Sequence, residues 1–203
     1  MPNGVLESHL RDRRESGRKL LVPYITGYMD NWQEAVAACV ANGADAVEIG
    51  LPFSDPVMDG PVIQRASTRA LQRGATPAKI LDGVRRLDVA VPLVVMCYYN
   101  TVFRAGHERF ANNVAQAGVA GVIVPDLPLE EAHDWCVAAD AAGVETVMLA
   151  APTASDERLG RIVQRARGFV YAVGLLGITG ERATLAATAV DIAARVKRQT
   201  DLP

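Results

Sequence analysis

A repeated block of glycine, apolar run and proline-bearing loop constrains the fold of this chain more than any other feature. The block reads GADAVEIGLP from Gly43, GVAGVIVPDLP from Gly118 and GVETVMLAAP from Gly143. In each copy the glycine is placed to end a helix, and the apolar run that follows has the length of a buried strand. Alternating helices and fully apolar strands predict a parallel sheet that is covered by helices.

Six strand-then-helix units follow one another along the chain. The last four expected strands begin at residues 92, 119, 144 and 169, so their starts are 27, 25 and 25 residues apart. The expected strands are 19–26, 44–50, 92–99, 119–124, 144–150 and 169–173. The expected helices are 5–18, 31–42, 62–73, 76–87, 106–117, 129–142, 155–167 and 183–199.

Two architectures fit this alternation, namely an open doubly wound sheet and a (β/α)8 TIM barrel. The open sheet usually carries a G-x-G-x-x-G loop after its first strand, whereas ITGYMDNW follows the first expected strand here. A barrel has eight strands, and the final TDLP reads as the approach to a seventh strand. We therefore expect a single, incomplete domain over residues 1–203, an α/β TIM barrel with about six βα units present.

The second expected strand has one bulky apolar face and one small face that ends in a carboxylate. In an extended chain Val47 and Ile49 face one way, while Ala44, Ala46 and Glu48 face the other. A carboxylate that points into a tight interior costs free energy unless it is paired or used. Glu48 is therefore either an interior charge paired with an arginine or a functional group at the end of a barrel strand.

Composition limits the class of protein. Half of the 203 residues are hydrophobic, which is enough for one sizeable core, and the net charge of −2 argues against a nucleic-acid binder. No apolar run approaches the roughly 20 residues that span a bilayer, and the polar N-terminus has no signal-peptide core. The three cysteines, Cys39, Cys97 and Cys136, lie far apart in apolar contexts. Reduced thiols of this kind predict a cytoplasmic protein with no membrane partner.

Several kinds of site are excluded by spacing. The histidines His9, His107 and His133 are isolated on expected helices and are expected to face solvent, and no Cys/His pair has metal-ligand spacing. None of the three lysines lies at the C-terminal end of a strand, which argues against imine chemistry. The sequence has no G-x-S-x-G motif. We therefore expect neither a metal nor a cofactor.

The remaining polar candidates are carboxylates in loops, and each has an ordinary structural reading. Asp55 precedes Pro56 and could simply form a turn. Asp59 precedes Gly60-Pro61 and could cap the following helix, and Asp126 could cap the helix after its strand. Each of them could equally belong to a site.

Aromatic and glycine-rich segments add weaker candidates. The tyrosines Tyr24, Tyr98 and Tyr171 lie near strand ends and could line a pocket, although a tyrosine at such a place is more often part of the core. The loop VGLLGITGER, which contains Gly180, has backbone N–H groups that could hold a phosphate. Simple flexibility explains the same glycines.

Three blocks taken together resemble the α subunit of tryptophan synthase. They are VEIGLPFSDPVMDGPVIQ, VPDLP and YAVGLLGITG, and the likeness runs in the same order from about Leu21 to Pro203. The resemblance implies a (β/α)8 barrel and a lyase that splits indole-3-glycerol phosphate into indole and glyceraldehyde 3-phosphate by a retro-aldol reaction in tryptophan biosynthesis. It implies no metal and no imine, because the protonated indole ring is itself the electron sink.

The resemblance also implies roles for residues around the reacting carbon. Glu48 matches the general acid/base, and an interior position should raise its pKa so that it carries a proton. Asp59 matches the residue that accepts the indole N–H and stabilises the developing cation. Tyr171 matches a tyrosine close to the catalytic glutamate, and Tyr24 stands where the family usually has an aromatic wall for the indole.

Further implied roles concern the phosphate and the partner. Gly180 matches a backbone donor to the phosphate, and Thr179 matches a residue that positions the catalytic aspartate when the loop closes. Asp55 and Pro56 match the loop that faces the β subunit of an α2β2 heterotetramer. The chain departs from the family at Leu175, where many relatives carry an arginine.

Length is the other departure. A TIM barrel normally has about 250 residues, and the seventh and eighth strands with the phosphate-binding loops that the resemblance implies are not in this sequence. We expect either a fragment of a longer product or a truncated form whose first and sixth strands are unpaired edges. Two alternatives to the lyase stay open. One is a catalytically impaired subunit that only binds or regulates a β subunit, and the other is a different phosphate-handling barrel enzyme, such as a sugar isomerase.

Overall fold

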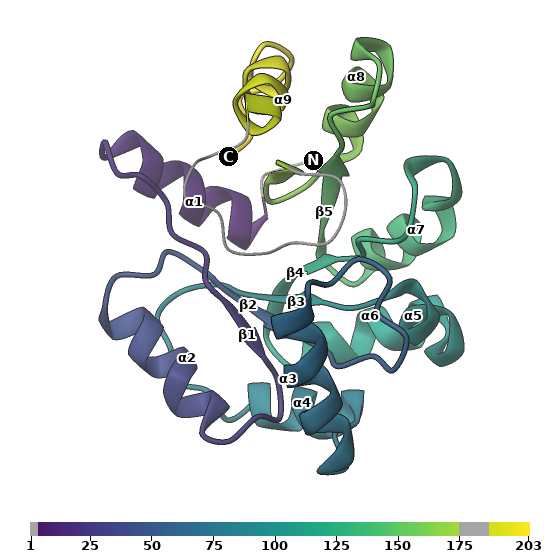
Figure 1. Ribbon diagram of the computed structural model, residues 1–203. Helices are drawn as coiled ribbons and strands as arrows, with labels where there is room; N and C mark the ends of the chain where they lie inside the picture. Colours follow the sequence, from purple (N-terminus) through teal and green to yellow (C-terminus); the bar gives the residue numbers. More distant parts are fainter. Residues whose placement is uncertain (1–3, 175–186) are drawn as a thin grey trace.

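An open, curved sheet of six parallel strands forms the centre of the computed structural model, which describes residues 4–174 and 187–203 (Figure 1). The strands lie in chain order from β1 to β6, and each neighbouring pair is parallel. Their bounds are β1 Tyr24–Thr26, β2 Val47–Gly50, β3 Leu93–Met96, β4 Val119–Ile123, β5 Glu145–Ala150 and β6 Val170–Ala172. This is the expected α/β barrel topology over six units.

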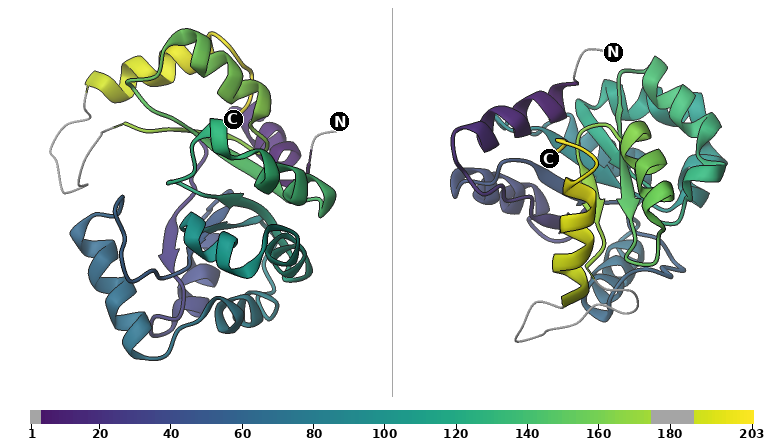
Figure 2. Two further views of the ribbon diagram at one scale, coloured as in Figure 1. Left: turned by 90° about the vertical axis from the view of Figure 1, so that its right-hand side faces the viewer. Right: turned by 90° about the horizontal axis from the view of Figure 1, so that it is seen from above.

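Helices cover the outer face of the sheet, and α1 lies across one end of it (Figures 1 and 2). The helices before β4 are α1 Val5–Glu15, α2 Trp32–Ala41, α3 Pro61–Gln72, α4 Pro77–Val84, α5 Tyr99–Ala105 and α6 His107–Gln116. Those after it are the 3-10 turn η1 Leu129–Glu131, α7 His133–Ala141, α8 Asp156–Arg165 and α9 Ala187–Lys197. In the part of the chain that the structure describes, no helix is long and apolar enough to cross a membrane.

The repeat glycines end helices, as the sequence predicts. Gly43, Gly118 and Gly143 follow α2, α6 and α7 with φ values of +94°, +79° and +72°. This left-handed conformation is strained for residues with a side chain, so glycine is the residue that turns the chain from helix into strand here. The recurring glycine therefore marks the point in each of these repeats where a helix ends and the next strand begins.

The larger hydrophobic core lies between the outer face of the sheet and its helices. Val47 and Ile49 of β2 are fully buried there, together with Trp32 of α2 and Phe110 of α6. Helix α7 adds Trp135, whose ring centroid lies 5.8 Å from that of Phe110. Each strand thus buries one side-chain set against helices, which accounts for the apolar runs in the sequence.

A second, smaller core fills the inner side of the sheet, and α1 supplies part of it. Leu6 and Leu10 of α1 are at most 1% exposed and pack with Ala46, Val94, Ile123 and Val147. A Cβ at Gly121 or Gly168 would come within 2.8 Å or 2.7 Å of the Leu6 Cδ2 atom. Glycine at both positions therefore makes room for α1 inside the sheet.

Polar contacts fix α1 in this place. The Glu145 carboxylate at the start of β5 accepts hydrogen bonds from the backbone N–H groups of Leu6 (2.7 Å) and Glu7 (2.9 Å). It therefore satisfies donors that the first turn of a helix leaves without partners. The fully buried Asp45 accepts from Arg13 (2.9 Å) and from the Leu21 N–H (2.9 Å). Burial alone would raise the pKa of Asp45, but these donors outweigh it and hold the pKa below its ordinary value.

The two edges of the sheet are β1 and β6, as the six-unit count predicts. The last residues of the chain lie beside the start of β6, where the Val170 N–H donates to the Pro203 carbonyl oxygen (3.0 Å). Arg11 of α1 also holds this segment through two hydrogen bonds to the Asp201 carboxylate. The final TDLP segment thus lies where a neighbour of β6 would begin.

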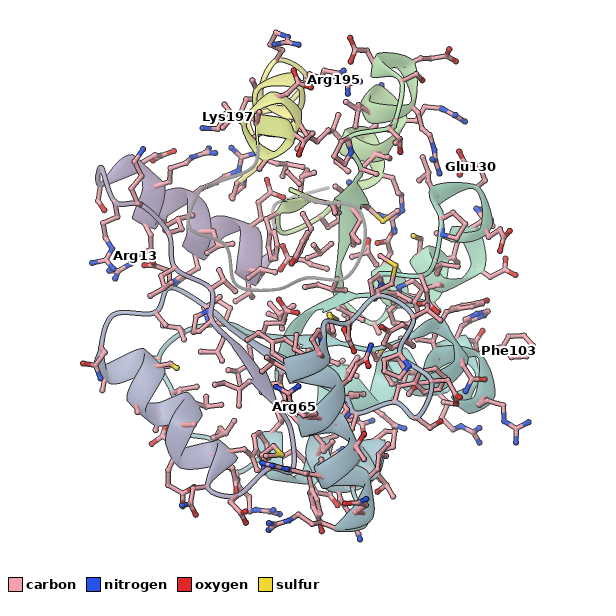
Figure 3. All side chains as sticks on the ribbon, viewed as in Figure 1. Arg13, Arg65, Phe103, Glu130, Arg195 and Lys197 are labelled. Carbon is pink, nitrogen blue, oxygen red and sulfur yellow. The ribbon has the colours of Figure 1, made fainter. Side chains whose placement is uncertain are left out.

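Some expected elements are wrong in their bounds. The strand expected at 19–26 is regular only over Tyr24–Thr26, because this edge strand has a neighbour on one side alone. Residues 99–105, read as the end of a strand and a loop, form α5. The helix expected at 129–142 is divided into η1 and α7, and Glu130 of η1 forms an ion pair with Arg158 of α8 (2.8 Å). The Glu130 side chain is labelled in Figure 3.

The expected small face of β2 also needs a correction. The strand begins at Val47, and residues 44–46 are irregular. Ala46 belongs to the inner core, as expected for the face of Glu48, whereas Ala44 packs in the outer core. Strict alternation fails before Val47 because the chain is not yet extended there.

Candidate active site

Glu48 lies in the middle of β2 on the inner face of the sheet. Glu48 is two residues after the inner-core residue Ala46, so its side chain is on the same face. Its neighbours in register are Tyr24 on β1 and Val94 on β3. Only 6% of Glu48 is exposed. An arginine partner would be the ordinary reason for a buried carboxylate, but no ion pair to Glu48 exists among the described residues.

Burial raises the pKa of Glu48 to about 7, and the nearby charge of Asp59 acts in the same direction. A carboxyl group with that pKa is partly protonated at neutral pH. It can therefore donate a proton and take one back, which is what an acid/base catalyst needs.

Asp59 belongs to the loop between β2 and α3, and only 9% of its surface is exposed. Its carboxylate accepts a hydrogen bond from the Tyr98 hydroxyl, which partly offsets the rise in the pKa of Asp59 that burial causes. The same hydroxyl oxygen accepts from the Met58 N–H (2.9 Å). Asp59 does not cap α3, because Gly60 is the N-cap residue and has no side chain to bond.

Tyr98 follows β3 and is 2% exposed. Burial is the main cause that raises its pKa to about 12, so the phenol stays protonated and can donate to Asp59. Phe53 stacks on the Tyr98 ring with centroids 5.0 Å apart. Tyr98 thus links the loop after β2 to the end of β3.

Tyr24 closes the site on the β1 side. Its ring crosses the backbone of Gly50, where a Cβ atom would lie 1.9 Å from the Tyr24 hydroxyl oxygen. Glycine is therefore required at the end of β2 if the ring is to lie there. Burial raises the pKa of Tyr24, with smaller contributions from the charges of Asp59 and Glu48.

Tyr171 on β6 completes the group from the far edge of the sheet. It is 41% exposed. Its pKa is raised by partial burial first and then by the charge of Glu48. Glu48, Asp59, Tyr24, Tyr98 and Tyr171 are therefore brought together on the inner side of the sheet.

The predicted partner and phosphate residues lie apart from this group. Asp55 is exposed and accepts a hydrogen bond from the Ser54 hydroxyl (2.5 Å), next to the half-buried Pro56. Thr179 and Gly180 lie outside the residues that the structure describes.

A pocket of about 220 Å3 adjoins the site at the C-terminal ends of the strands. Met58 of the β2 loop lines it together with Leu149, Val173 and Arg158. Two larger surface grooves, one between α6 and α7 and one near the starts of β3 and β4, include neither Glu48 nor Asp59. The pocket of about 220 Å3 is not lined by Glu48 or Asp59 either, but it reaches the β2 loop through Met58, the residue before Asp59. It lies at the C-terminal ends of the strands, where enzymes of barrel topology place their chemistry.

Other titratable candidates have structural contacts. Asp126 accepts from the Tyr99 N–H (2.8 Å) and so holds the start of α5, not of the helix that follows it in sequence. His107 lies 2.9 Å from the Tyr99 hydroxyl, and His9 is half-buried with a buried Nε2 atom. The expectation of solvent-facing histidines is therefore wrong for these two. Within the described ranges, no cluster of three or more His, Cys, Asp and Glu residues is arranged to hold a metal.

Residues 10–203 match the family described as tryptophan synthase alpha chain. The alpha chain of Thermobifida fusca is 44% identical over 206 residues, which cover 98% of this chain and 76% of that relative. The alpha chain of Methanosarcina mazei is 43% identical over 197 residues, covering 96% of this chain and 71% of that relative. The chain belongs to the tryptophan synthase α chain family.

Solved structures of the α chain family have the same fold. A structure of tryptophan synthase from Mycobacterium tuberculosis matches with a TM-score of 0.91 at 36% identity, over 99% of this chain and 79% of that one. A structure of the tryptophan synthase a2b2 complex from Pyrococcus furiosus matches with a TM-score of 0.82 at 37% identity, over 90% and 75% of the two chains. The barrel expected from the resemblance is therefore confirmed as the family fold.

Two contacts around Asp59 were not found from the sequence of this α chain family member. Phe53 and Gln64 both lie in the block VEIGLPFSDPVMDGPVIQ, which carries the resemblance. Phe53 stacks on Tyr98, and the Gln64 side-chain amide donates to the Asp59 carbonyl oxygen (2.8 Å). The spacing of Gln64, four residues after the helix N-cap Gly60, was the available signal, because that position faces back over the first turn.

Proposed function

We propose that this chain catalyses the α reaction of tryptophan synthase, the retro-aldol cleavage of indole-3-glycerol phosphate to indole and glyceraldehyde 3-phosphate. One observation carries the proposal. Two buried carboxylates, Glu48 and Asp59, lie close enough for the charge of one to raise the pKa of the other, and they differ in their surroundings. Two carboxyl groups in unlike environments can take different protonation states and different roles.

The reaction needs a proton at the indole C3 atom and loses one from the side-chain hydroxyl. Protonated Glu48 donates to C3, and the carboxylate so formed accepts the hydroxyl proton as the carbon–carbon bond breaks and the aldehyde forms. The electrons of that bond return to the indole ring. Glu48 regains a proton in place of the one that it gave, so the two products together contain all the atoms of the substrate. Ionised Asp59 accepts the ring N–H and stabilises the positive charge that develops on the ring.

The aromatic residues support this assignment by their positions. Tyr24 gives the indole an apolar wall beside Glu48, and the Tyr98 hydroxyl holds the Asp59 carboxylate. Tyr171 stands on the other edge, near enough for its pKa to respond to Glu48. Thr179 and Gly180 remain our candidates for positioning Asp59 and for binding the substrate phosphate.

A single substitution tests the acid/base assignment. Glu48→Gln keeps the shape of the side chain and removes its proton chemistry, so we expect kcat to fall by about 10²- to 10⁴-fold. Glu131→Gln alters an exposed carboxylate away from the site and serves as the matched control. Indole release is measured with indole-3-glycerol phosphate, and circular dichroism checks folding. Near-normal turnover by Glu48→Gln would show that the assigned mechanism is wrong.

We also propose that the chain assembles with a tryptophan synthase β subunit as an α2β2 complex, through the loop that contains Asp55 and Pro56. The Pyrococcus furiosus relative is described as such a complex. Val57 in this loop is 79% exposed, and Phe103 of α5, 64% exposed, projects away from the body of the protein (Figure 3). Exposed apolar side chains of this size favour a protein partner.

The redox state of the cysteines indicates the cellular compartment of the protein. Cys39, Cys97 and Cys136 are free cysteines. Free buried thiols fit a reducing compartment, so we assign the chain to the cytoplasm.

A further inference from the structure

Asp59 is held through its backbone as well as through its carboxylate. The side-chain amide of Gln64 donates to the Asp59 carbonyl oxygen at 2.8 Å. The Gln64 backbone N–H donates to the carbonyl oxygen of Gly60 at 3.0 Å. One residue of α3 therefore binds two successive carbonyl groups, at the point where the loop becomes helix.

The loop has few other attachments near this point. Gly60 offers no side-chain cap, and Pro61 has no backbone N–H to donate. On the other side, the Met58 N–H donates to the Tyr98 hydroxyl, and the backbone of Asp59 contacts the same hydroxyl. Besides the peptide chain through Gly60, the Gln64 amide thus ties the backbone of Asp59 to a regular element by a hydrogen bond.

Helix α3 is a firm support for such a link. Its Ser67 and Ala70 side chains are at most 2% exposed, and the helix packs against β1. Because α3 is fixed against the sheet, a hydrogen bond of normal length from Gln64 also holds the backbone of Asp59 at a fixed place relative to the sheet. The position of the Asp59 carboxylate, which lies on an irregular loop, is therefore restricted by its attachment to a packed helix.

We propose that Gln64 is a positioning residue that fixes where the Asp59 carboxylate stands relative to Glu48. The inference rests on the proposed function for its significance, but the geometry that it describes can be tested without turnover. Without the amide, the loop end is released, and a largely buried carboxylate gains hydration by moving toward solvent. Asp59 would then stand farther from Glu48 and from the indole N–H.

Gln64→Met isolates the hydrogen bond. Methionine matches glutamine in length and in helix propensity, but it has no N–H donor. Gln33→Met is the matched control, since Gln33 of α2 is also half-buried and its side-chain amide also donates to a backbone carbonyl, that of Gly83, at 2.9 Å. Both variants lose one bond of the same kind, and only one of those bonds adjoins Asp59.

The measurement is the titration of Glu48 in the full chain, followed by NMR of side-chain 13C-labelled glutamate, with Glu48→Gln identifying the signal. Asp59 raises the pKa of Glu48 in the native site, while Tyr24 and Tyr171 are the other titratable groups facing it. We expect the titration midpoint of Glu48 to fall by about 0.5 in pH in Gln64→Met, as a like charge moves away. In Gln33→Met it should stay at the wild-type value.

Turnover gives a second readout. We expect kcat to fall about tenfold in Gln64→Met with a small change in KM, because misplacing a group that acts on the transition state affects the rate first. An unchanged Glu48 titration in Gln64→Met would overturn the inference, as would an equal shift in Gln33→Met. If Glu48→Gln kept its activity, the proposed function would fail, whereas the titration would still decide the role of Gln64.

Discussion

At the scale of single residues, the decisive feature is a carboxyl group that keeps its proton near neutral pH. Glu48 is surrounded by apolar and aromatic groups, with Asp59 as a like charge, and both effects favour its neutral form. Asp59 receives a hydrogen bond from Tyr98, which favours its ionised form. The site therefore places two carboxyl groups in different surroundings, although burial raises the pKa of both.

The pH dependence of activity follows from the pKa of about 7 for Glu48. The first step needs the protonated form, which is lost as pH rises through that value. We expect kcat/KM to fall about tenfold for each pH unit well above pH 7. Steady-state rates between pH 6 and 9 check this, and a flat profile up to pH 9 would contradict the assigned role of Glu48.

The same raised pKa predicts how Glu48 affects stability. Because the folded pKa lies above the ordinary value of 4.5, the folded state holds the proton more tightly, and stability falls as pH rises from about 4.5 to about 7. Glu48→Gln should therefore raise the free energy of unfolding at pH 8 by up to about 3 kcal/mol. At pH 4 it should change little. Urea unfolding at both values is the measurement, and equal effects at both would contradict the burial cause.

The inward position of Glu48 was predictable from the sequence because strand alternation places it on one face by local geometry alone. The proposed roles of Glu48 and Asp59 came from the resemblance to the family. The contacts that tune the pair were not predictable. Tyr98 meets Met58 and Asp59 across about 40 residues of chain, and that meeting depends on how the β2 loop folds over the end of β3. Alternation also failed at Ala44, where the strand has not yet begun.

At the scale of elements, α1 shows how a charged residue can serve the fold instead of the site. Glu145 begins a strand that is mostly apolar, and its carboxylate accepts from two backbone N–H groups of α1, 139 and 138 residues earlier in the chain. The sequence could not indicate this pairing, since local patterns do not report which helix end will face a strand. For the same reason α5 was missed, because its first N–H is held by Asp126, 27 residues away.

Removing this cap should loosen α1 selectively. Glu145→Ala leaves the Leu6 and Glu7 N–H groups without their partner, so we expect a loss of about 2–4 kcal/mol in the free energy of unfolding. Hydrogen exchange should speed up in α1 more than elsewhere. Glu131→Ala, at an exposed site, is the control and should change stability by less than about 0.5 kcal/mol. Unchanged exchange in α1 would show that the cap is dispensable.

At the scale of the whole molecule, the parallel direction of the six strands was predictable from the repeat, because alternating helices and apolar strands form a parallel sheet. Their sequential order followed from the choice of the barrel, which the resemblance to the family supports. The curvature of the sheet and the packing of α1 on its inner side were not predictable. Both depend on how inner side chains such as Leu6 and Leu10 pack against several strands at once. Two exposed valines on different parts of the surface make the proposed partner contact testable.

Val57 and Val190 form a matched pair for that test. They are 79% and 58% exposed, Val57 on the proposed partner loop and Val190 on α9. We expect Val57→Asp to weaken binding to a tryptophan synthase β subunit by tenfold or more, because a charge would be buried at an apolar contact. Val190→Asp should bind as the unaltered chain does. Isothermal titration calorimetry measures both, and equal affinities would rule out this loop as the contact.

The seating of α1 also has a consequence for the order in which the chain matures on the ribosome. Helix α1 is made well before its C-terminal partner, because Arg11 binds Asp201, which lies 190 residues later. At about 5–20 residues per second, α1 waits on the order of 10 s or more for this contact after its own synthesis. The inner-core partners of Leu6 and Leu10, which end with Val147, are made before Asp201, so α1 can pack against the sheet before the C-terminal segment is tied to it.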